Sequence, residues 1–152
     1  MAVRQRVKQR FGSPAEAAAV GVLMAADHLQ QTFAEICARH GITTDQYGVL
    51  RILRDAPPSG FARGQIAAQC IHRSPDTTRM LDRLVRQGLA RRTVDRADRR
   101  CSVATITRAG RALLRRVDPE IAAAARRLTQ PLSGSQLQQL AHLTGTLAGH
   151  DD

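Results

Sequence analysis

The chain has 152 residues, of which 43% are hydrophobic. That is enough for one domain with a buried core and too apolar for a disordered chain. It carries 23 basic against 13 acidic residues, a formal charge of +10, which favours nucleic acid as a partner, with an anionic membrane surface second. The scarcity of aromatic residues, 3% of the chain, argues against a stacking platform for single-stranded nucleic acid.

Several other classes are disfavoured by simple patterns. No apolar run is long enough to span a membrane, and the Ala-rich stretch near the start, interrupted by Glu16 and Asp27, does not resemble a signal peptide. Cys37, Cys70 and Cys101 are too widely spaced for a CxxC pair or a disulfide framework. We therefore expect a cytoplasmic protein with no membrane partner.

The first part of the chain predicts a basic arm and two helices. Residues 1–12 alternate basic and other residues and are expected to form a flexible arm, which either touches phosphates or only aids solubility. A helix begins at the cap Ser13, followed by Pro14, and ends near His40 and Gly41. A capping box at 43–46 opens a second helix that runs to about residue 55.

The middle part predicts two short helices and a hairpin. Residues 64–70 form the first helix; residues 74–87 form the second, with Ser74 as its cap, Pro75 at its first position and Gly88 as its stop. Residues 89–94 and 101–106 have strand character, and the charged loop between them completes a β-hairpin. Ala62 stands where a Ser or Thr cap is expected, so the first short helix should begin loosely.

The last part predicts two more helices. Thr107 caps a long helix in which Asp118 and Pro119 imply a kink or a restart, because proline removes a backbone donor. A capping box at 133–136 opens the final helix. The expected fold is mainly α, with one small β-hairpin.

The helix at 74–87 has two contrasting faces. Its apolar face carries Met80, Leu81, Leu84 and Val85, with Thr77 beside them. Its polar face carries Asp76, Arg79, Arg83 and Arg86. A helix that reads the major groove has this form, but so does an ordinary amphipathic surface helix. The order short helix, reading helix, charged hairpin decides between them, because it is the order of a winged helix-turn-helix.

The chain resembles the MarR (multiple-antibiotic-resistance regulator) family of bacterial transcription factors along almost its whole length. The resemblance rests on "ITTDQYGVLRIL", on "GQIAAQCIHRSPDTTRMLDRLVRQGLARR" and above all on "DRADRRCSVATITRAG". The last stretch is similar to the wing signature of the family: Asp98 and Arg100 form its Asp-x-Arg pair, and Ile106, Thr107 and Gly110 form its end.

The resemblance implies that the protein is a homodimer and that residues 1–152 form a single domain. Residues 13–40 and 107–150 would form the dimerisation helices, and residues 43–106 the DNA-binding lobe. The family binds pseudo-palindromic duplex DNA, usually as a repressor, and often releases it when a small aromatic anion binds between platform and lobe. Tyr47, Arg51 and His40 could line such a pocket, but Tyr47 could equally belong to the core.

Site residues follow from the same resemblance. Thr78 and Arg79 would contact the major groove, Arg100 in the wing at 95–101 would enter the minor groove, and Asp98 would stabilise the wing through a salt bridge. The expected DNA-binding residues are His72, Arg73, Ser74, Asp76, Thr78, Arg79, Arg83, Arg96, Arg99 and Arg100. Arg96 and Arg99 could also be simply solvated.

Two other functions stay open as alternatives. A winged helix can serve as a protein-interaction module. A cysteine could sense redox state, although this requires a lowered pKa that sequence does not reveal. No metal site, cofactor or catalytic group is expected, because the histidines are scattered and the sequence contains no phosphate loop, paired carboxylates or nucleophilic triad.

Overall fold

The computed structural model describes residues 12–70, 76–94 and 102–149. Its elements in chain order are α2 (Pro14–Arg39), α3 (Thr44–Arg54), β1 (Phe61–Ala62), α4 (Arg63–Gln69), α5 (Thr77–Arg86), β2 (Ala90–Val94), β3 (Ser102–Ile106), α6 (Arg108–Thr129) and α7 (Gly134–Leu147). The expected class, mainly α with a small β-hairpin, is confirmed. None of the described helices has the length and apolar character needed to cross a bilayer.

The predicted caps at Ser13, Thr43, Thr107 and Ser133 are present. The hydroxyls of Ser13 and Thr107 accept hydrogen bonds from backbone N–H groups three residues on, and complete capping boxes open α3 and α7. The Glu16 carboxylate accepts from the N–H of Gly12 at 2.8 Å. Gly41, with φ of 74°, follows the end of α2 as predicted, since glycine tolerates this left-handed conformation.

Two helices differ from their predicted course. The described part of α5 begins at Thr77 with Asp76 at its cap position, three residues after the expected start; Ser74 and Pro75 lie outside the described residues. The long helix α6 continues through Pro119 without a restart. Burial of Leu114, Val117 and Ile121 on one face of α6 explains its continuity, because tertiary packing can outweigh one lost backbone hydrogen bond.

The sheet has one strand more than the sequence predicts. Its order is β1-β3-β2, and both pairs are antiparallel, with Ala62 opposite Val103 and Arg92 opposite Ala104. A two-residue strand gives no periodic signal, which is why β1 escaped detection. It also fixes the start of α4, where the Gln65 side chain accepts from the Ala62 N–H at 2.8 Å and partly replaces the missing cap.

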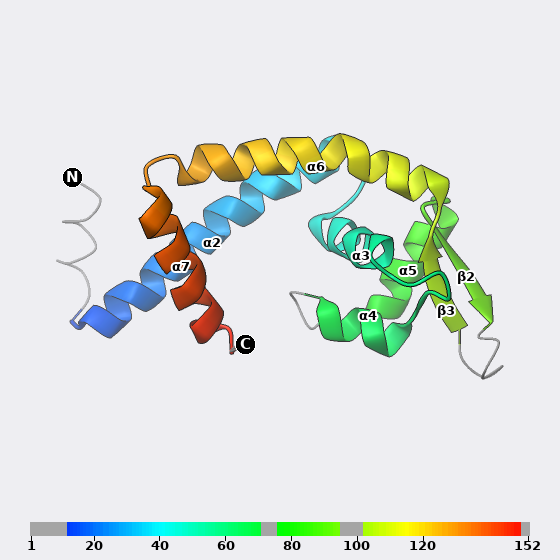
Figure 1. Ribbon diagram of the computed structural model, residues 1–152, viewed down its shortest axis with the longest axis horizontal. Helices are drawn as coiled ribbons and strands as arrows, with labels where there is room; N and C mark the ends of the chain where they lie inside the picture. Colours follow the sequence, from blue (N-terminus) through cyan, green and yellow to red (C-terminus); the bar gives the residue numbers. More distant parts are fainter. Residues whose placement is uncertain (1–11, 71–75, 95–101, 150–152) are drawn as a thin grey trace.

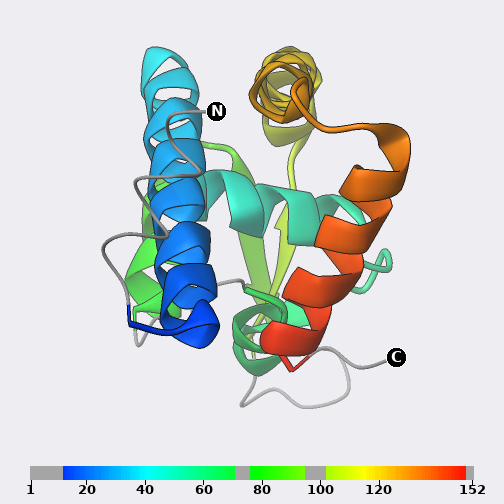
Figure 2. The ribbon, with the colours of Figure 1, turned by 90° about the vertical axis from the view of Figure 1, so that its left-hand side faces the viewer.

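The elements form a lobe and a pair of long helices (Figure 1). The lobe contains α3, α4, α5 and the sheet, and α6 runs from it across the top of the molecule. Figure 2, turned by 90°, shows α2 and α7 on opposite sides of the molecule, with α6 seen end-on at the top between them. The core lies where the lobe meets the long helices, and its largest fully buried side chains are Leu50, Leu53, Ile66, Leu81, Leu84 and Leu114.

Candidate nucleic-acid interface

Helix α5 has the two faces that the sequence predicts. Leu81 and Leu84 are fully buried, Thr77 is buried beside them, and Met80 and Val85 pack against the core. The three arginines of the opposite face, Arg79, Arg83 and Arg86, are exposed. The burial of the apolar face therefore holds the basic face toward solvent, and this is the geometry that a groove-reading helix requires.

Arg79 is largely open to solvent. Its side chain is 85% exposed, and its Nε lies 3.5 Å from the Asp76 carboxylate. An exposed ion pair at that distance contributes little, so the guanidinium can turn to a base edge at small cost. Thr78 is half-buried next to it. Asp76, Thr78, Arg79 and Arg83 thus lie together at one helix.

The other predicted contacts cannot be placed. His72, Arg73 and Ser74, and the wing residues Arg96, Asp98, Arg99 and Arg100, lie outside the described residues.

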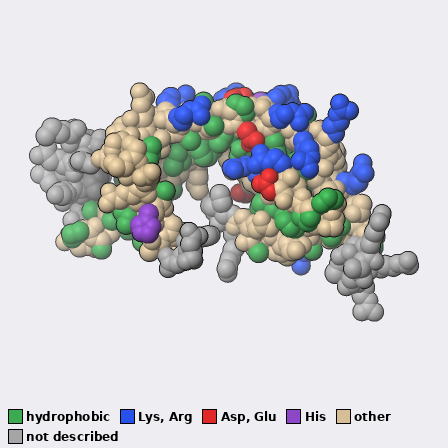
Figure 3. Space-filling view, in the orientation of Figure 1, with side chains coloured by type: hydrophobic (Ala, Val, Ile, Leu, Met, Phe, Trp, Pro, Cys, Tyr) green, Lys and Arg blue, Asp and Glu red, His purple; other side chains and the backbone are tan. Residues whose placement is uncertain are grey.

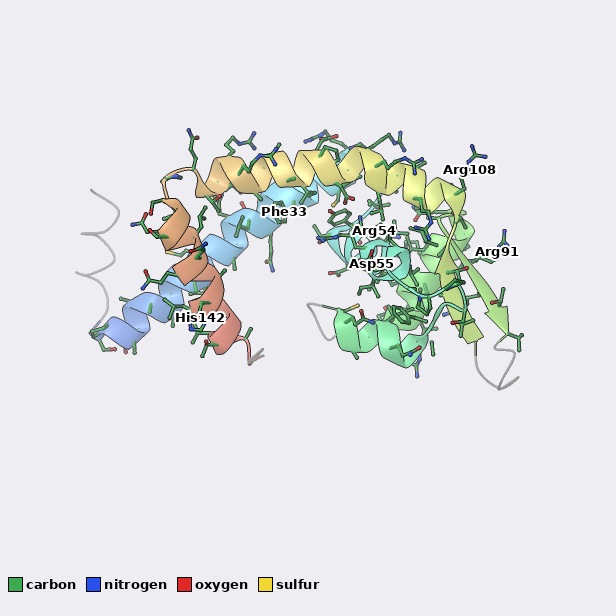
Figure 4. All side chains as sticks on the ribbon, in the orientation of Figure 1. Phe33, Arg54, Asp55, Arg91, Arg108 and His142 are labelled. Atoms are coloured by element: carbon green, nitrogen blue, oxygen red, sulfur yellow. The ribbon has the colours of Figure 1, made fainter. Side chains whose placement is uncertain are left out.

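An ion pair that the sequence reasoning missed joins the helix to the hairpin. Arg92 on β2 donates to the Asp82 carboxylate on α5 at 2.7 Å. The neighbouring Arg91 is exposed and points away from the lobe (Figure 4). Successive side chains of a strand point to opposite faces of the sheet, so Arg91 and Arg92 must face opposite ways. This is the sequence signal from which the inward direction of one of them could have been inferred. The pair fixes the base of the hairpin relative to α5.

A second polar network connects the lobe to α6. Asp118 accepts from the Tyr47 hydroxyl at 2.7 Å and from the Arg54 guanidinium at 2.8 Å. Arg54 also pairs with Asp55 at 3.1 Å, and both lie beneath α6 (Figure 4). Burial, followed by the hydrogen bond to Asp118, raises the pKa of Tyr47 to about 12. The carboxylate just before Pro119 therefore connects the lobe to the long helix.

A pocket of about 310 Å³ lies between α2 and α6. Its lining residues are Thr32, Glu35, Ile36, Arg39, Glu120, Ala123, Ala124 and Arg127. Glu120 accepts from Arg39 and contacts His40, each at 2.7 Å, and these hydrogen bonds, that of Arg39 first, lower the pKa of its carboxyl. Of the three residues suggested for an effector pocket, His40 adjoins this pocket, whereas Arg51 lies over the Tyr47 ring at 5.8 Å.

The described thiols are poorly suited to redox sensing. Cys37 is fully buried and Cys70 half-buried, and burial raises the pKa of both. A raised pKa leaves less of the reactive thiolate at neutral pH. Cys101 lies outside the described residues. Within the part of the chain that is described, no group of acidic, histidine or cysteine side chains could hold a metal ion.

Comparison with known proteins shows the family of this chain. The sequence model of the MarR family matches residues 40–100. A curated relative, the homoprotocatechuate degradative operon repressor of Escherichia coli, is 32% identical over 124 residues, which cover 82% of each chain. The chain belongs to the MarR family. It is therefore a transcriptional regulator and not an enzyme.

Solved MarR-family structures share the fold. Sco3205 of Streptomyces coelicolor, solved in complex with DNA, is 25% identical with a TM-score of 0.80, over 91% of this chain and 89% of that one. CouR of Rhodococcus jostii, solved with p-coumaroyl-CoA, is 19% identical with a TM-score of 0.78, over 91% and 96%. These likenesses confirm that the lobe is a winged helix.

Proposed function

We propose that two copies of this chain form a dimer that represses transcription by binding a pseudo-palindromic operator, and that a small aromatic anion releases the DNA. The observation that carries the DNA-binding part is the exposed arginine face of α5, held outward by buried Leu81 and Leu84. As a regulator of bacterial operator DNA, the protein would act in the cytoplasm.

Unpartnered apolar residues on the outer helices support the dimer. In the described residues α7 has no buried side chain, and its Leu140, Leu143 and Leu147 are exposed. Val22, Leu23 and Met24 of α2 are exposed as well. Such residues are ordinarily covered, which fits residues 13–40 and 107–150 as dimerisation helices around a lobe formed by residues 43–106.

The dimer would present two reading helices to the same side of a duplex. In this proposal α5, with the preceding residues from 74 onward, enters the major groove through Thr78, Arg79 and Arg83, while Asp76 orients Arg79. Half-sites are then about 34–36 Å apart, one helical turn. The remaining predicted contacts would come from two stretches beside this helix: His72, Arg73 and Ser74 before it, and Arg96, Arg99 and Arg100 in a wing that Asp98 stabilises.

A titration against the DNA upstream of its own gene tests the interface. We expect Arg79→Ala to weaken binding by about 1–3 kcal/mol and to relax base preference. Arg51→Ala on α3, an exposed arginine with the same charge change, is the matched control and should bind this DNA as the wild type does. Equal affinity of the Arg79→Ala variant and the wild type would contradict the role of α5.

The wing carries a separate prediction. Arg100→Ala should weaken binding most on A/T-rich flanks, where a narrow minor groove has the strongest negative potential. Footprinting on duplexes that differ only in those flanks measures the effect. Operator binding like that of the wild type would show that Arg100 does not enter the groove.

Salt dependence separates this function from a protein-interaction module. Each phosphate contact lowers the slope of log affinity against log salt by about 0.9, so binding of the duplex should fall steeply. A flat response, or no binding, would favour the module.

Aromatic acids are the proposed effectors. The relatives' names point to aromatic acids, because one relative is a homoprotocatechuate operon repressor and CouR was solved with p-coumaroyl-CoA. Hydroxylated aromatic carboxylic acids should therefore raise the melting temperature of the free protein and release the operator. If a panel of such acids does neither, the assignment of this effector class is wrong.

A further inference from the structure

The outer face of α6 carries a row of arginines that the reading helix does not use. Figure 3 shows basic side chains gathered along the upper edge of the molecule, over α6. We define the α6 stripe as the exposed arginines of this helix: Arg108, Arg111, Arg115, Arg116, Arg126 and Arg127. Along a helix that rises about 1.5 Å per residue, the stripe is roughly 28 Å long.

The acidic side chains of α6 are paired with basic residues outside the stripe. Asp118 pairs with Arg54 and also accepts from Tyr47, and the half-exposed Glu120 pairs with Arg39 and His40. Among the described residues, Arg115, Arg116, Arg126 and Arg127 form no ion pair. Ordinary protein surfaces intersperse both signs of charge, so a row of one sign is an electrostatic feature that attracts a polyanion.

The stripe and the reading helix lie on different sides of the lobe. The buried face of α6 packs on α2 and α3, and α3 separates α6 from α4 (Figure 1). Figure 2 shows α6 at the top of the molecule and the lobe helices below it. A duplex seated on α5 therefore leaves the stripe uncovered.

We propose that the α6 stripe is a second, sequence-independent binding surface for duplex DNA, so that a dimer seated on its operator can hold another DNA segment. This rests on the proposed operator binding. An extended row of guanidinium groups matches a rod of regularly spaced phosphates, whereas a small anion requires donors that converge on one point.

The residues between the arginines argue against a membrane. Ala112, Pro119, Ala122 and Ala123 occupy the outer face of α6, and helices that lie in a membrane surface carry bulky apolar side chains there.

A two-step capture experiment tests the proposal. An immobilised duplex carrying the operator is saturated with protein, and a labelled duplex of unrelated sequence is then added at low salt. The wild type should retain the second duplex. A variant with Arg115, Arg116, Arg126 and Arg127 all changed to Gln should load on the first duplex normally but retain at least about tenfold less of the second, because the released counterions supply the affinity.

The same four positions changed to Lys form the matched control, since lysine keeps the charge and should keep the capture. Failure of the wild type to capture the second duplex, or full capture by the Gln variant, would overturn the proposal. Binding of phosphatidylglycerol vesicles by the protein, without binding of the second duplex, would also overturn it.

The two proposals fail in distinguishable ways. If no variant loads on the first duplex, the operator function is wrong. The stripe is then still tested by titrating free protein with the unrelated duplex, where equal affinities of the Gln and Lys variants would refute it.

Discussion

Asp118 joins two parts of the molecule that are distant in sequence. It follows Val117 in the core and precedes a proline, and its two oxygens hold Tyr47 and Arg54 of α3. The cluster is half-buried, so these charge-assisted hydrogen bonds are stronger than those of a fully solvated pair. One carboxylate thus connects the DNA-binding lobe to the helix that leads away from it.

Tyr47 reports on this contact, because it is the only tyrosine of the chain and there is no tryptophan. We expect Asp118→Asn to lower the pKa of Tyr47 from about 12 while leaving it above the ordinary value, because burial is the larger cause. The ultraviolet absorbance of tyrosinate during a pH titration measures this. Asp55→Asn, which removes a partner of Arg54 but not of Tyr47, is the control and should leave the midpoint unchanged.

The same raised pKa has a consequence for stability. Between the unfolded pKa of about 10 and the folded pKa of about 12, the native chain keeps a proton that the unfolded chain has lost. The contribution of Tyr47 is therefore complete below the unfolded pKa and is lost as pH rises through the folded pKa. Denaturant unfolding should show a fall in the free energy of unfolding over this window, and the fall should be smaller in Asp118→Asn. An equal fall in both proteins would contradict the role of Asp118.

At the scale of elements, the hairpin and the long helix are closely packed where they meet. Thr107 caps α6 by accepting from the Gly110 N–H at 3.0 Å, and its hydroxyl donates to the Gly88 carbonyl at 2.7 Å. Gly110 packs directly against the turn before β2. A Cβ there would overlap the Leu89 carbonyl oxygen and come within 2.7 Å of Cγ1 of Ile106.

Gly110→Ala should therefore destabilise the protein by about 1–3 kcal/mol, the usual cost of forcing atoms into a packed site. Thermal or denaturant unfolding measures the change. Gly48→Ala within α3 is the matched control: a Cβ there meets no atom within 4 Å, so it should be neutral or stabilise by up to about 1 kcal/mol. If the two variants have the same free energy of unfolding, the close contact at Gly110 does not limit the size of the side chain there.

At the scale of the whole molecule, one chain leaves its outer helices only partly covered. The apolar residues of α7 and of the first half of α2 are exposed, while the lobe has a complete core. The lobe is thus packed within one chain, whereas the outer helices keep exposed apolar side chains that a second chain would cover in the proposed dimer.

Leu140→Glu should weaken the dimer by more than about 2 kcal/mol, because a charge would be buried in an apolar interface. Gln138→Glu, on the opposite side of α7, adds the same charge and should leave the dimer intact. Sedimentation over a range of protein concentrations compares the two. An unchanged dissociation constant for Leu140→Glu would place the interface elsewhere.

The sequence by itself determined the helices, the hairpin, the family and the two faces of α5. These depend on local patterns: caps at Ser13, Thr43, Thr107 and Ser133, and apolar residues at helical spacing. Such features depend on residues only a few positions apart. They can therefore be recognised in the sequence without the tertiary contacts.

Only the tertiary structure decided how the pieces join. The Arg92–Asp82 and Arg54–Asp118 pairs, the short strand β1 and the continuity of α6 through Pro119 all depend on segments that meet after folding. A proline that looks like a break is tolerated because Val117 and Ile121 are held in the core on either side of it. Contacts between residues that are distant in sequence produce no periodic pattern in the chain. They therefore become apparent only in the folded structure.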